Sequence, residues 1–477
     1  MRQKPIALIL AAGQGTRMKS DRAKVLHEVA GRPLIAWAIL AAKEAAASRI
    51  IVVLGHQRDE VTAVIREQFG DEIEIAIQEQ QRGTGDAVIA GLTILADEPD
   101  DAIVVVLSGD VPRFRGERIA ELTEATRSAP GKMALVSART LDPSGYGRIV
   151  RSSEGGLAKI VEHADATTSQ RAIDEINAGF YGFGLGLLRS EISTLTVDNA
   201  QGELYLTDVG ERAAKRGQVP VLEVPFDDIR GINTRVDLAE VEASARGDIC
   251  HRWMLAGVTI VDPKHTYIDV SVEDIGQDTW IGPGVCLRGN TSIGRRVRID
   301  TCSVLANVII GDDTWIKPHS VLGDSKVGEL VQIGPFAHCR PGTVLDERVK
   351  VGNFVETKKT HIMAGAKASH LAYLGDASIG QGANVGAGTI TCNYDGFNKH
   401  RTTIEAGAFI GTDSQLVAPV TVGRNAYVGA GTTVTKDVPR SSLALSRTKQ
   451  VNVEGWADRF REAQRKRMIR KTNGESS

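Results

Sequence analysis

The sequence of 477 residues has few cysteines, no long apolar run and almost no net charge. Its five cysteines are scattered without C-x-x-C spacing, which argues against a zinc site and against a disulfide framework. The net charge of −2 provides no global field for nucleic acid or for an acidic membrane. No apolar stretch reaches membrane-spanning length, and the run at residues 6–10 is too short for a signal peptide. We therefore expect a cytoplasmic protein without nucleic-acid partners and without membrane insertion.

The most regular feature of the sequence is a six-residue repeat between Ile275 and Val434. Each hexad opens with an aliphatic residue, and a glycine or another small residue usually follows it. Six consecutive hexads begin at Ile275, and six more begin at Ile404. This period fits one flat side of a parallel β-helix, whose coils stack their aliphatic residues inward. The small residues suit the tight corners between the sides.

Two interruptions of the repeat are candidate functional regions. One lies between Val355 and Ile379, and the other spans Thr391 to Thr403, where residues 392–400 must leave the coil as a loop. A prism of stacked coils has exposed flat faces, so it commonly associates with copies of itself. Hexapeptide prisms are familiar as trimers with sites between subunits, and we therefore expect a homotrimer.

The N-terminal part has a different pattern, in which short apolar strands alternate with helical segments. Strands are expected at residues 6–10, 50–54 and 103–107, and helices at 34–46 and 61–69. This order predicts a parallel sheet covered by helices on both faces, with ligands beyond the carboxyl ends of the strands. Residues 234–255 follow with helical composition and one apolar face, which predicts a helix joining the two parts; that face comprises Leu238, Val241, Ala245 and Ile249.

Two of the expected strand ends carry residues suited to phosphate binding. A glycine-rich loop at residues 11–18 contains Arg17, and Lys24 follows it, while Asp110 comes soon after the strand at 103–107. Backbone amides and cations can hold phosphates, and a carboxylate can hold Mg²⁺ against them. The loop lacks the third glycine of a dinucleotide fingerprint and the lysine of a Walker loop. Each feature alone is equally explained as a turn, a surface cation or a loop cap, but together they favour a nucleotide site.

Longer motifs carry a resemblance to known families. Residues 10–18 (LAAGQGTRM), 83–85 (GTG), 145–148 (GYGR), 160–163 (IVEH), 175–177 (EIN) and 231–233 (GIN) resemble the sugar-1-phosphate nucleotidyltransferase (pyrophosphorylase) family. Residues 353–359 (NFVETKK), 370–376 (HLAYLGD) and 388–396 (GTITCNYDG) narrow the resemblance. With them the chain resembles the bacterial bifunctional N-acetylglucosamine-1-phosphate uridylyltransferase/glucosamine-1-phosphate acetyltransferases over essentially residues 4–456.

The resemblance implies a fold and a pair of reactions. It implies a Rossmann-like uridylyltransferase domain at residues 1–233, a helical linker at 234–255, a left-handed parallel β-helix acetyltransferase domain at 256–452 and a basic tail at 453–477. Glucosamine-1-phosphate would be acetylated from acetyl-CoA, and N-acetylglucosamine-1-phosphate would then react with UTP in a Mg²⁺-dependent step that releases pyrophosphate. The product, UDP-N-acetylglucosamine, would feed peptidoglycan and lipopolysaccharide precursor synthesis.

The resemblance also implies the residues of the uridylyltransferase site. Asp110 and Asn233 would hold Mg²⁺, while Arg17 and Lys24 would offset triphosphate charge. Gln78 and Gly83 would contact uracil. The full nucleotide and sugar set comprises Leu10, Ala11, Ala12, Gly13, Lys24, Gln78, Gly83, Thr84, Ser108, Gly109, Asp110, Gly147, Glu162, Asn177 and Asn233, of which Gly147, Glu162 and Asn177 would hold the sugar. The sequence departs from some relatives at Gln14 and Ser108, which leaves the reaction class intact.

For acetyl transfer, the resemblance implies His370 as the general base. Without the motif, a lone histidine is more often structural. Arg340 and Lys358 would bind the phosphate of glucosamine-1-phosphate, and Tyr373 and Asn384 its sugar. The Ala387 amide would face the thioester oxygen; acetyl-CoA would be held by Ala387, Asn393, Tyr394, Thr412, Ala430 and Arg447, with Thr412 in place of a serine found in some relatives.

Three alternatives remain open from the residues. The chain could be a nucleotidyltransferase of another specificity whose β-helix only oligomerises it. The prism could bind zinc or iron at subunit interfaces, or it could be an inert spacer; histidines available for a metal are His319, His338, His361 and His370. The basic tail is expected to be a surface helix or a disordered end, with closure over a neighbouring acetyl-CoA site as the lesser expectation.

Overall fold

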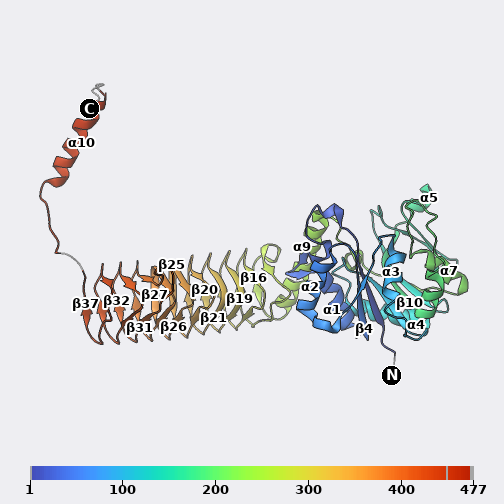
Figure 1. Cartoon of the computed structure of the whole chain (residues 1–477), viewed down its shortest axis with the longest axis horizontal. Coiled ribbons are helices and arrows are strands. Elements are labelled where there is room, and N and C mark those ends of the chain that lie inside the picture. The colour runs from blue at the N-terminus through green and yellow to red at the C-terminus, as the bar shows by residue number, and fades with distance from the viewer. Residues whose placement is uncertain (1–2, 447–448, 473–477) are drawn as a thin grey trace. The chain divides into compact units, whose positions relative to one another are not determined.

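The computed structural model describes residues 3–446 and 449–472. The chain forms two compact units, residues 1–307 and 308–477, and the division falls within strand β19 (Val304–Ile310). Figure 1 labels the elements of both units. Each unit is described by itself below.

The first unit is built on a nine-stranded sheet with the central order β11-β7-β10-β6-β1-β4-β5. The strands β1, β4, β5 and β6 are parallel and consist mainly of apolar residues, since helices cover both faces. Side chains from α1, α2 and α4 pack on one face, and those from α3, α6 and α7 pack on the other. The strands are β1 (Ile6–Ala11), β4 (Arg49–Leu54), β5 (Glu74–Ile77), β6 (Ile103–Ser108), β7 (Met133–Arg139), β8 (Arg148–Arg151), β9 (Leu157–Val161), β10 (Glu175–Gly184) and β11 (Val221–Glu223). The helices are α1 (Leu34–Glu44), α2 (Arg58–Phe69), α3 (Thr84–Leu92), α4 (Gly116–Ser128), α5 (Thr168–Arg171), α6 (Leu185–Ile192), α7 (Asp208–Arg216) and α8 (Phe226–Ile229), with 3₁₀ turns η1 (Thr16–Met18), η2 (Lys24–Leu26) and η3 (Gly70–Glu72).

The expected parallel sheet is correct for β1, β4, β5 and β6 but wrong beyond β6, where the sheet is mixed. Strand β10 runs antiparallel to both β6 and β7. Strands β8 and β9 form an antiparallel pair beside β10. The short connection between β8 and β9 leaves no room for the crossover that a parallel pair requires.

The helix expected at residues 234–255 forms as α9 (Arg235–Leu255). The Thr234 side chain accepts a hydrogen bond from the Asp237 amide, and the Asp237 side chain accepts one from the Thr234 amide. The helix therefore begins with a capping box. Its buried residues follow the expected apolar face and include Val241, Ala245 and Ile249. Within the first unit it contacts the small sheet of β2 (Glu28–Val29) and β3 (Arg32–Pro33), and also η4 (Pro263–His265), β12 and β13.

The hexads form short parallel strands whose aliphatic residues are buried. In the first unit, Asp274 pairs with Ser292 and Trp280 with Arg298, so one coil takes 18 residues, or three hexads. This spacing and the hexapeptide repeats fit a three-sided, left-handed parallel β-helix. The strands before β19 are β12 (Thr259–Ile260), β13 (Tyr267–Ile268), β14 (Asp274–Ile275), β15 (Trp280–Ile281), β16 (Cys286–Arg288), β17 (Ser292–Ile293) and β18 (Arg298–Ile299).

The second unit repeats this coil. Its strands are β20 (Trp315–Ile316), β21 (Val321–Val327), β22 (Gln332–Ile333), β23 (His338–Cys339), β24 (Val344–Leu345), β25 (Lys350–Lys358), β26 (His361–Ile362), β27 (Lys367–Gly375), β28 (Ala377–Ile379), β29 (Asn384–Val385), β30 (Ile390–Cys392), β31 (Thr402–Ile404), β32 (Phe409–Ile410), β33 (Gln415–Val417), β34 (Val420–Val422), β35 (Tyr427–Val428), β36 (Thr433–Val434) and β37 (Leu443–Ala444). The tail forms helix α10 (Trp456–Thr472).

Glycine follows many of the buried aliphatic residues because successive coils approach closely there. A Cβ on Gly276 would lie 2.6 Å from backbone atoms of the next coil, and one on Gly411 would lie 2.5 Å from the Ala430 nitrogen. Real Cβ atoms do not come this close to backbone. The small residue expected at the corner is therefore required by the stacking distance between coils.

Both expected interruptions of the repeat are present in the second unit. Strands β25 and β27 are nine residues long and pair over most of their length. Later, Ala377 pairs with Thr402, so the coil between them carries extra residues, and Tyr394 bridges to Lys399 within this excursion. Among the described residues, no helix combines the length and apolarity needed to cross a membrane.

Candidate functional sites

A cavity of about 410 Å³ lies at the carboxyl ends of β1 and β6. The Gly109 amide donates a 2.9 Å hydrogen bond to the Leu10 carbonyl, which joins the two strand ends. Residues expected from the sequence that line the cavity are Leu10, Ala11, Ala12, Gly13, Lys24, Gln78, Gly83, Thr84, Ser108 and Asp110. Most of the residues expected to contact the nucleotide therefore line one cavity at the carboxyl ends of parallel strands, where such sheets usually bind ligands.

Two cations and two oxygen ligands converge beside this cavity. The Lys24 ammonium bonds the Asp110 carboxylate and lies 3.4 Å from the Asn233 amide oxygen. Arg17 donates to the same Asn233 oxygen at 3.0 Å. Burial would raise the pKa of Asp110, but the charge of Lys24 and the hydrogen bond from Ser108 more than offset it, so the net pKa is lowered. Asp110 is therefore held ionised.

The donor set at this point fits a magnesium ion. The Asp110 carboxylate and the Asn233 amide oxygen both face the Lys24 ammonium, so two oxygens from separate segments already share one cation. Mg²⁺ prefers oxygen ligands and is usually held by one or two protein groups plus substrate phosphates. The pair matches that requirement.

The residues expected to hold the sugar meet at the edge of β8 and β10. A Cβ on Gly147 would lie 3.4 Å from the Asn177 Cβ and 3.5 Å from Glu162 Oε2, so the three residues are in contact distance. Thr207 donates to Glu162 at 3.1 Å. Burial raises the pKa of Glu162, and nearby carboxylates add to the effect. Asn177 donates to the hydroxyl of Tyr181 at 2.7 Å, and Tyr181 lines the nucleotide cavity.

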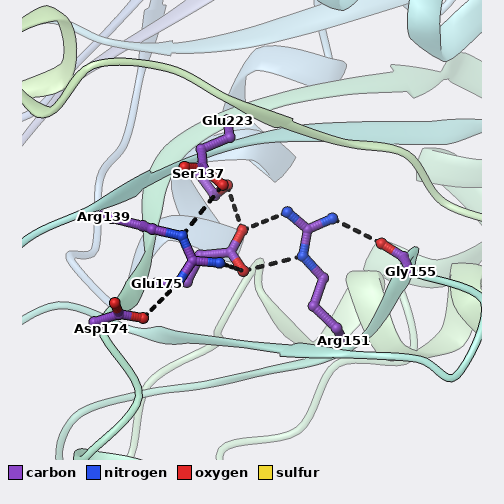
Figure 2. A network of polar contacts seen from close by, with 7 residues as sticks. All are labelled: Ser137, Arg139, Arg151, Gly155, Asp174, Glu175 and Glu223. Atoms are coloured by element: carbon purple, nitrogen blue, oxygen red, sulfur yellow. Dashed lines mark hydrogen bonds and ion pairs between the residues drawn. The ribbon is translucent and has the colours of Figure 1, made fainter.

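An ion-pair network centred on the buried Glu175 joins the strand that carries Asn177 to its neighbours (Figure 2). The Glu175 carboxylate accepts hydrogen bonds from Arg151 at 2.5 and 3.0 Å and from Ser137 at 2.6 Å. Arg139 lies 3.6 Å away. Burial would raise the pKa of Glu175, but these hydrogen bonds more than offset it and the net pKa is lowered. The network ties β10 to β7 and β8 two residues before Asn177.

Some residues of this site had no signal in the sequence. Gln81 donates to the Ala12 carbonyl at 2.7 Å. The cavity is lined by Gln81 and also by Tyr181 and Glu203. Gln78 is buried and its amide nitrogen donates to Asp86 at 2.9 Å, which leaves its oxygen for a ligand. Tyr181 and Glu203 could be placed at the cavity only from the structure, in which β10 and the segment around Glu203 approach the end of β1.

The expected base of the second site has a defined orientation. His370 on β27 lies in register with Asn353 on β25, one coil earlier. The His370 Nδ1 and the Asn353 Oδ1 are 2.6 Å apart. An amide oxygen can only accept, so Nδ1 is the protonated nitrogen of the neutral ring, and Nε2 then keeps its lone pair. Asn353 belongs to a motif noted in the sequence, but its partnership with His370 depends on the coil length.

Cationic residues gather farther along the strands that carry Asn353 and His370. Arg340 pairs with Glu356 at 2.7 Å, and Glu356 is in register with Tyr373. The neighbouring ammonium of Lys399 lowers the pKa of Lys358, which shows that the two lysines are close. Lys399 comes from the loop that leaves the coil, and the sequence did not single it out. Two like charges held together favour an anionic ligand.

Tyr373 and Asn393 meet beside the end of β27. A Cβ on Gly375 would lie 2.4 Å from the Tyr373 hydroxyl and 2.8 Å from the Asn393 amide nitrogen. Asn393 is buried and donates to Asp376 at 2.5 Å. Asn384 lies on β29 and pairs with Lys367 of β27. Tyr394 is exposed, and its hydroxyl donates to the Gly396 carbonyl.

Three residues expected to hold acetyl-CoA form a column on successive coils. Asp413 N–H bonds the Ala387 carbonyl at 2.7 Å, and Gly431 N–H bonds the Thr412 carbonyl at 2.8 Å. Ala387, Thr412 and Ala430 therefore follow one another along one edge of the prism. Arg447 lies outside the residues that the structure describes.

The histidines proposed for a metal alternative are dispersed. Within residues 3–446 and 449–472, no group of three or more His, Cys, Asp or Glu side chains is arranged to hold a metal ion. His361 bonds Asp346 at 2.9 Å, and His319 stacks on Phe336. Each therefore has another partner within its own chain.

Comparison with known proteins finds two family matches in different parts of the chain. Residues 7–173 match the MobA-like NTP transferase domain, and residues 401–436 match the bacterial transferase hexapeptide (six repeats). The "Bifunctional protein GlmU" of Trichlorobacter lovleyi is 49% identical over 456 residues, covering 94% of this chain and 97% of that protein. The protein of the same name from Sorangium cellulosum is 49% identical over 460 residues, covering 95% and 96%. That of Geobacillus sp. (strain WCH70) is 45% identical over 459 residues, covering 96% and 98%. This identity along nearly the whole length shows that the chain belongs to the bifunctional GlmU family.

Proposed function

We propose that the chain makes UDP-N-acetylglucosamine in two steps, acetyl transfer to glucosamine-1-phosphate followed by uridylyl transfer to N-acetylglucosamine-1-phosphate. The observation that carries the proposal is the presence of two separate residue sets, one at the carboxyl ends of a nucleotidyltransferase sheet and one on the β-helix. Both lie in a chain that matches bifunctional relatives over 94% of its length. UTP and acetyl-CoA are the co-substrates. Because both are cytoplasmic metabolites, we also propose a cytoplasmic location.

In the acetyl transfer, the amine of glucosamine-1-phosphate attacks the thioester carbonyl of acetyl-CoA. His370 accepts the amine proton at Nε2, which carries the lone pair in the neutral tautomer that the Asn353 contact selects. Arg340 and Lys358 bind the sugar phosphate, and Tyr373 and Asn384 position the sugar. The Ala387 amide stabilises the oxyanion, and the C–S bond then breaks to release coenzyme A. The acetyl-CoA groove follows the column of Thr412 and Ala430; Asn393, Tyr394 and Arg447 complete the proposed set.

In the uridylyl transfer, a phosphate oxygen of N-acetylglucosamine-1-phosphate attacks the α-phosphorus of UTP and pyrophosphate leaves. Such a displacement needs alignment and charge neutralisation more than a protein nucleophile. Arg17 and Lys24 supply positive charge along the triphosphate, and the backbone of residues 10–13 lies against the nucleotide. Gly147, Glu162 and Asn177 hold the sugar. The raised pKa of Glu162 favours a shared proton with a sugar hydroxyl.

Mg²⁺ is the cofactor of this step, and Asp110 and Asn233 are the residues that would hold it. When bound, the ion neutralises phosphate charge and polarises the attacked phosphorus. Lys24 contacts both of these residues. Its ammonium would then neutralise triphosphate charge beside the attacked phosphorus.

The hexapeptide repeats favour oligomerisation, and we propose a homotrimer. On one corner of the second unit, His319, Phe336 and Phe354 stack with centroid distances of 5.0 and 5.4 Å, and Leu371 continues the column. These side chains are exposed in the single chain. An exposed apolar column of this length is typical of an interface. Since Phe354 and Leu371 adjoin Asn353 and His370, a neighbouring copy on this corner would also enclose the acetyl-transfer site.

The test is to supply Mg²⁺, UTP and glucosamine-1-phosphate and to measure pyrophosphate release with and without acetyl-CoA. Release that requires acetyl-CoA supports the two steps in this order. The His370→Ala variant should lose this release but keep release from N-acetylglucosamine-1-phosphate. If no thiol is freed from acetyl-CoA and another sugar phosphate is used directly, the single-activity alternative with an oligomerising β-helix holds instead.

A further inference from the structure

Arg148 is the largest buried side chain that these two reactions leave without a role. It opens β8, directly after Gly147, and is 1% exposed. No carboxylate lies within ion-pair distance of it among the described residues, and its Nε–H has no acceptor there. Burial lowers the pKa of its guanidinium and the charge of Arg171 adds to the effect, while the charge of Asp142 offsets only part of it. A buried unpaired arginine is costly, so its contacts have to compensate.

The contacts of Arg148 all lead to segments around the sugar residues. Its Nη1 donates to the Tyr146 carbonyl, on the loop that ends in Gly147. Its Nη2 lies 3.4 Å from the His163 Nδ1, on the residue after Glu162, and 3.4 Å from the Arg171 carbonyl at the end of α5. The guanidinium therefore connects three segments: the loop before β8, the end of β9 and the end of α5.

The geometry of the sugar residues depends on this connection. The Gly147 carbonyl accepts from the Asn177 amide at 2.9 Å, and the Gly147 Cα faces Glu162 and Asn177. Gly147 and Glu162 stay in contact only if the loop and the strand end that carry them do not move apart. A rigid, planar guanidinium with several donors can set that separation in a way that a flexible ammonium cannot.

We propose that Arg148 is a positioning residue for the sugar end of the uridylyltransferase site, holding the Tyr146–Gly147 loop against the Glu162–His163 strand end. This rests on the proposed assignment of the sugar to Gly147, Glu162 and Asn177. Arg148 has no access to the substrate, so it acts only through these neighbours. Misplacement of binding groups by about 1 Å can cost up to about 100-fold in rate.

The experiment measures pyrophosphate release by the full-length Arg148→Met variant, varying N-acetylglucosamine-1-phosphate at saturating UTP and then the reverse. We expect KM for the sugar phosphate to rise by about 10-fold or more, with KM for UTP changed by less than about 2-fold. Arg148→Lys should recover part of the loss. Acetyl transfer by the same protein should stay at the wild-type rate, which monitors the β-helix part of each preparation.

Arg151→Met is the matched control, because Arg151 lies on the same strand and bonds Glu175 on β10 rather than the Tyr146–Gly147 loop or the Glu162–His163 strand end. If it raises KM for the sugar phosphate as much as Arg148→Met, the effect is general loosening of β8 and the proposal fails. The proposal also fails if Arg148→Met alters both KM values equally or neither. If Arg148→Met does not fold, Arg148→Lys decides by the same two KM values.

Glu162→Gln, measured in parallel, separates this inference from the proposed function. A raised sugar KM in Glu162→Gln with none in Arg148→Met refutes the role of Arg148 and leaves the sugar site in place. An unchanged sugar KM in both variants refutes the sugar assignment itself.

Discussion

Replacing Asn353 by leucine tests whether the His370 tautomer controls acetyl transfer. Leucine has nearly the size of asparagine but cannot accept a hydrogen bond. The 2.6 Å contact between Asn353 Oδ1 and His370 Nδ1 would be lost, while the coil around Val351 and Val355 should remain packed. His370 could then rotate or place its proton on Nε2, where no lone pair remains for the amine proton.

The magnitude follows from the worth of one exposed hydrogen bond. A net contribution of about 0.5–1.5 kcal/mol corresponds to a loss of roughly 2- to 12-fold in the rate of acetyl transfer. A carboxylate also accepts from Nδ1–H, so Asn353→Asp should retain more activity than Asn353→Leu. The contact is exposed, so neither change should affect folding greatly.

The assay is the release of free thiol from acetyl-CoA with glucosamine-1-phosphate, at saturating levels of both. Uridylyl transfer from UTP to N-acetylglucosamine-1-phosphate by the same preparation is the control and should not change. The reasoning is refuted if Asn353→Leu matches the wild type, or if Asn353→Asp is as impaired as Asn353→Leu.

Four further predictions concern stability, metal binding and assembly. Glu175→Gln should lower the free energy of unfolding of the first unit, because the arginines around this buried carboxylate lose their ionised partner. The loss should be limited to about 2 kcal/mol, since these arginines are partly exposed and solvent screens part of the interaction. Since folding lowers the pKa of Glu175 below its ordinary value of 4.5, its contribution is present above pH 4.5 and is lost as pH falls through the folded pKa, so urea titrations of variant and wild type should converge in acid. Gly276→Ala should cost about 1–3 kcal/mol in thermal unfolding, whereas Gly247→Ala on α9, where a Cβ meets open space, should be neutral or stabilising. Asp110→Asn should raise the Mg²⁺ concentration needed for half-maximal pyrophosphate release by roughly tenfold or more without altering acetyl transfer, and an unchanged Mg²⁺ dependence would contradict the metal assignment. Phe354→Glu should weaken self-association in sedimentation velocity by placing a charge in the exposed aromatic column, and an unchanged oligomer would move the interface elsewhere.

The fold of the β-helix was predictable because its repeat is local. Each regular hexad carries its own inward aliphatic residue and usually a small residue after it, so the sequence reports the sides of the coils wherever the repeat is unbroken. The mixed sheet was less predictable. The parallel part was visible in alternating strands and helices, but the reversed direction of β10 depends on which neighbours it pairs with, and no local pattern encodes that choice.

The two candidate sites differ in the same way. Lys24 and Asp110 could be linked from sequence, since both follow parallel strands whose carboxyl ends lie at one edge. Gln81 and Tyr181 could not, because they reach the cavity from a loop and an antiparallel strand. Asn353 and His370 are 17 residues apart, and they meet only because the coil there is one residue shorter than three full hexads.

By itself, the sequence determined the hexapeptide prism, the αβ alternation of the first part, the joining helix and, through its motifs, the family and the residues to test. Those features depend on local periodicity and on motifs of a few neighbouring residues. Only the tertiary structure decided which donors face which acceptors: that Asn353 orients His370, that Lys24 contacts both proposed metal ligands, and that Arg148 is buried between the segments of the sugar site. Such contacts join residues far apart in the chain. Their distances depend on packing between segments, which the local sequence of one segment does not encode.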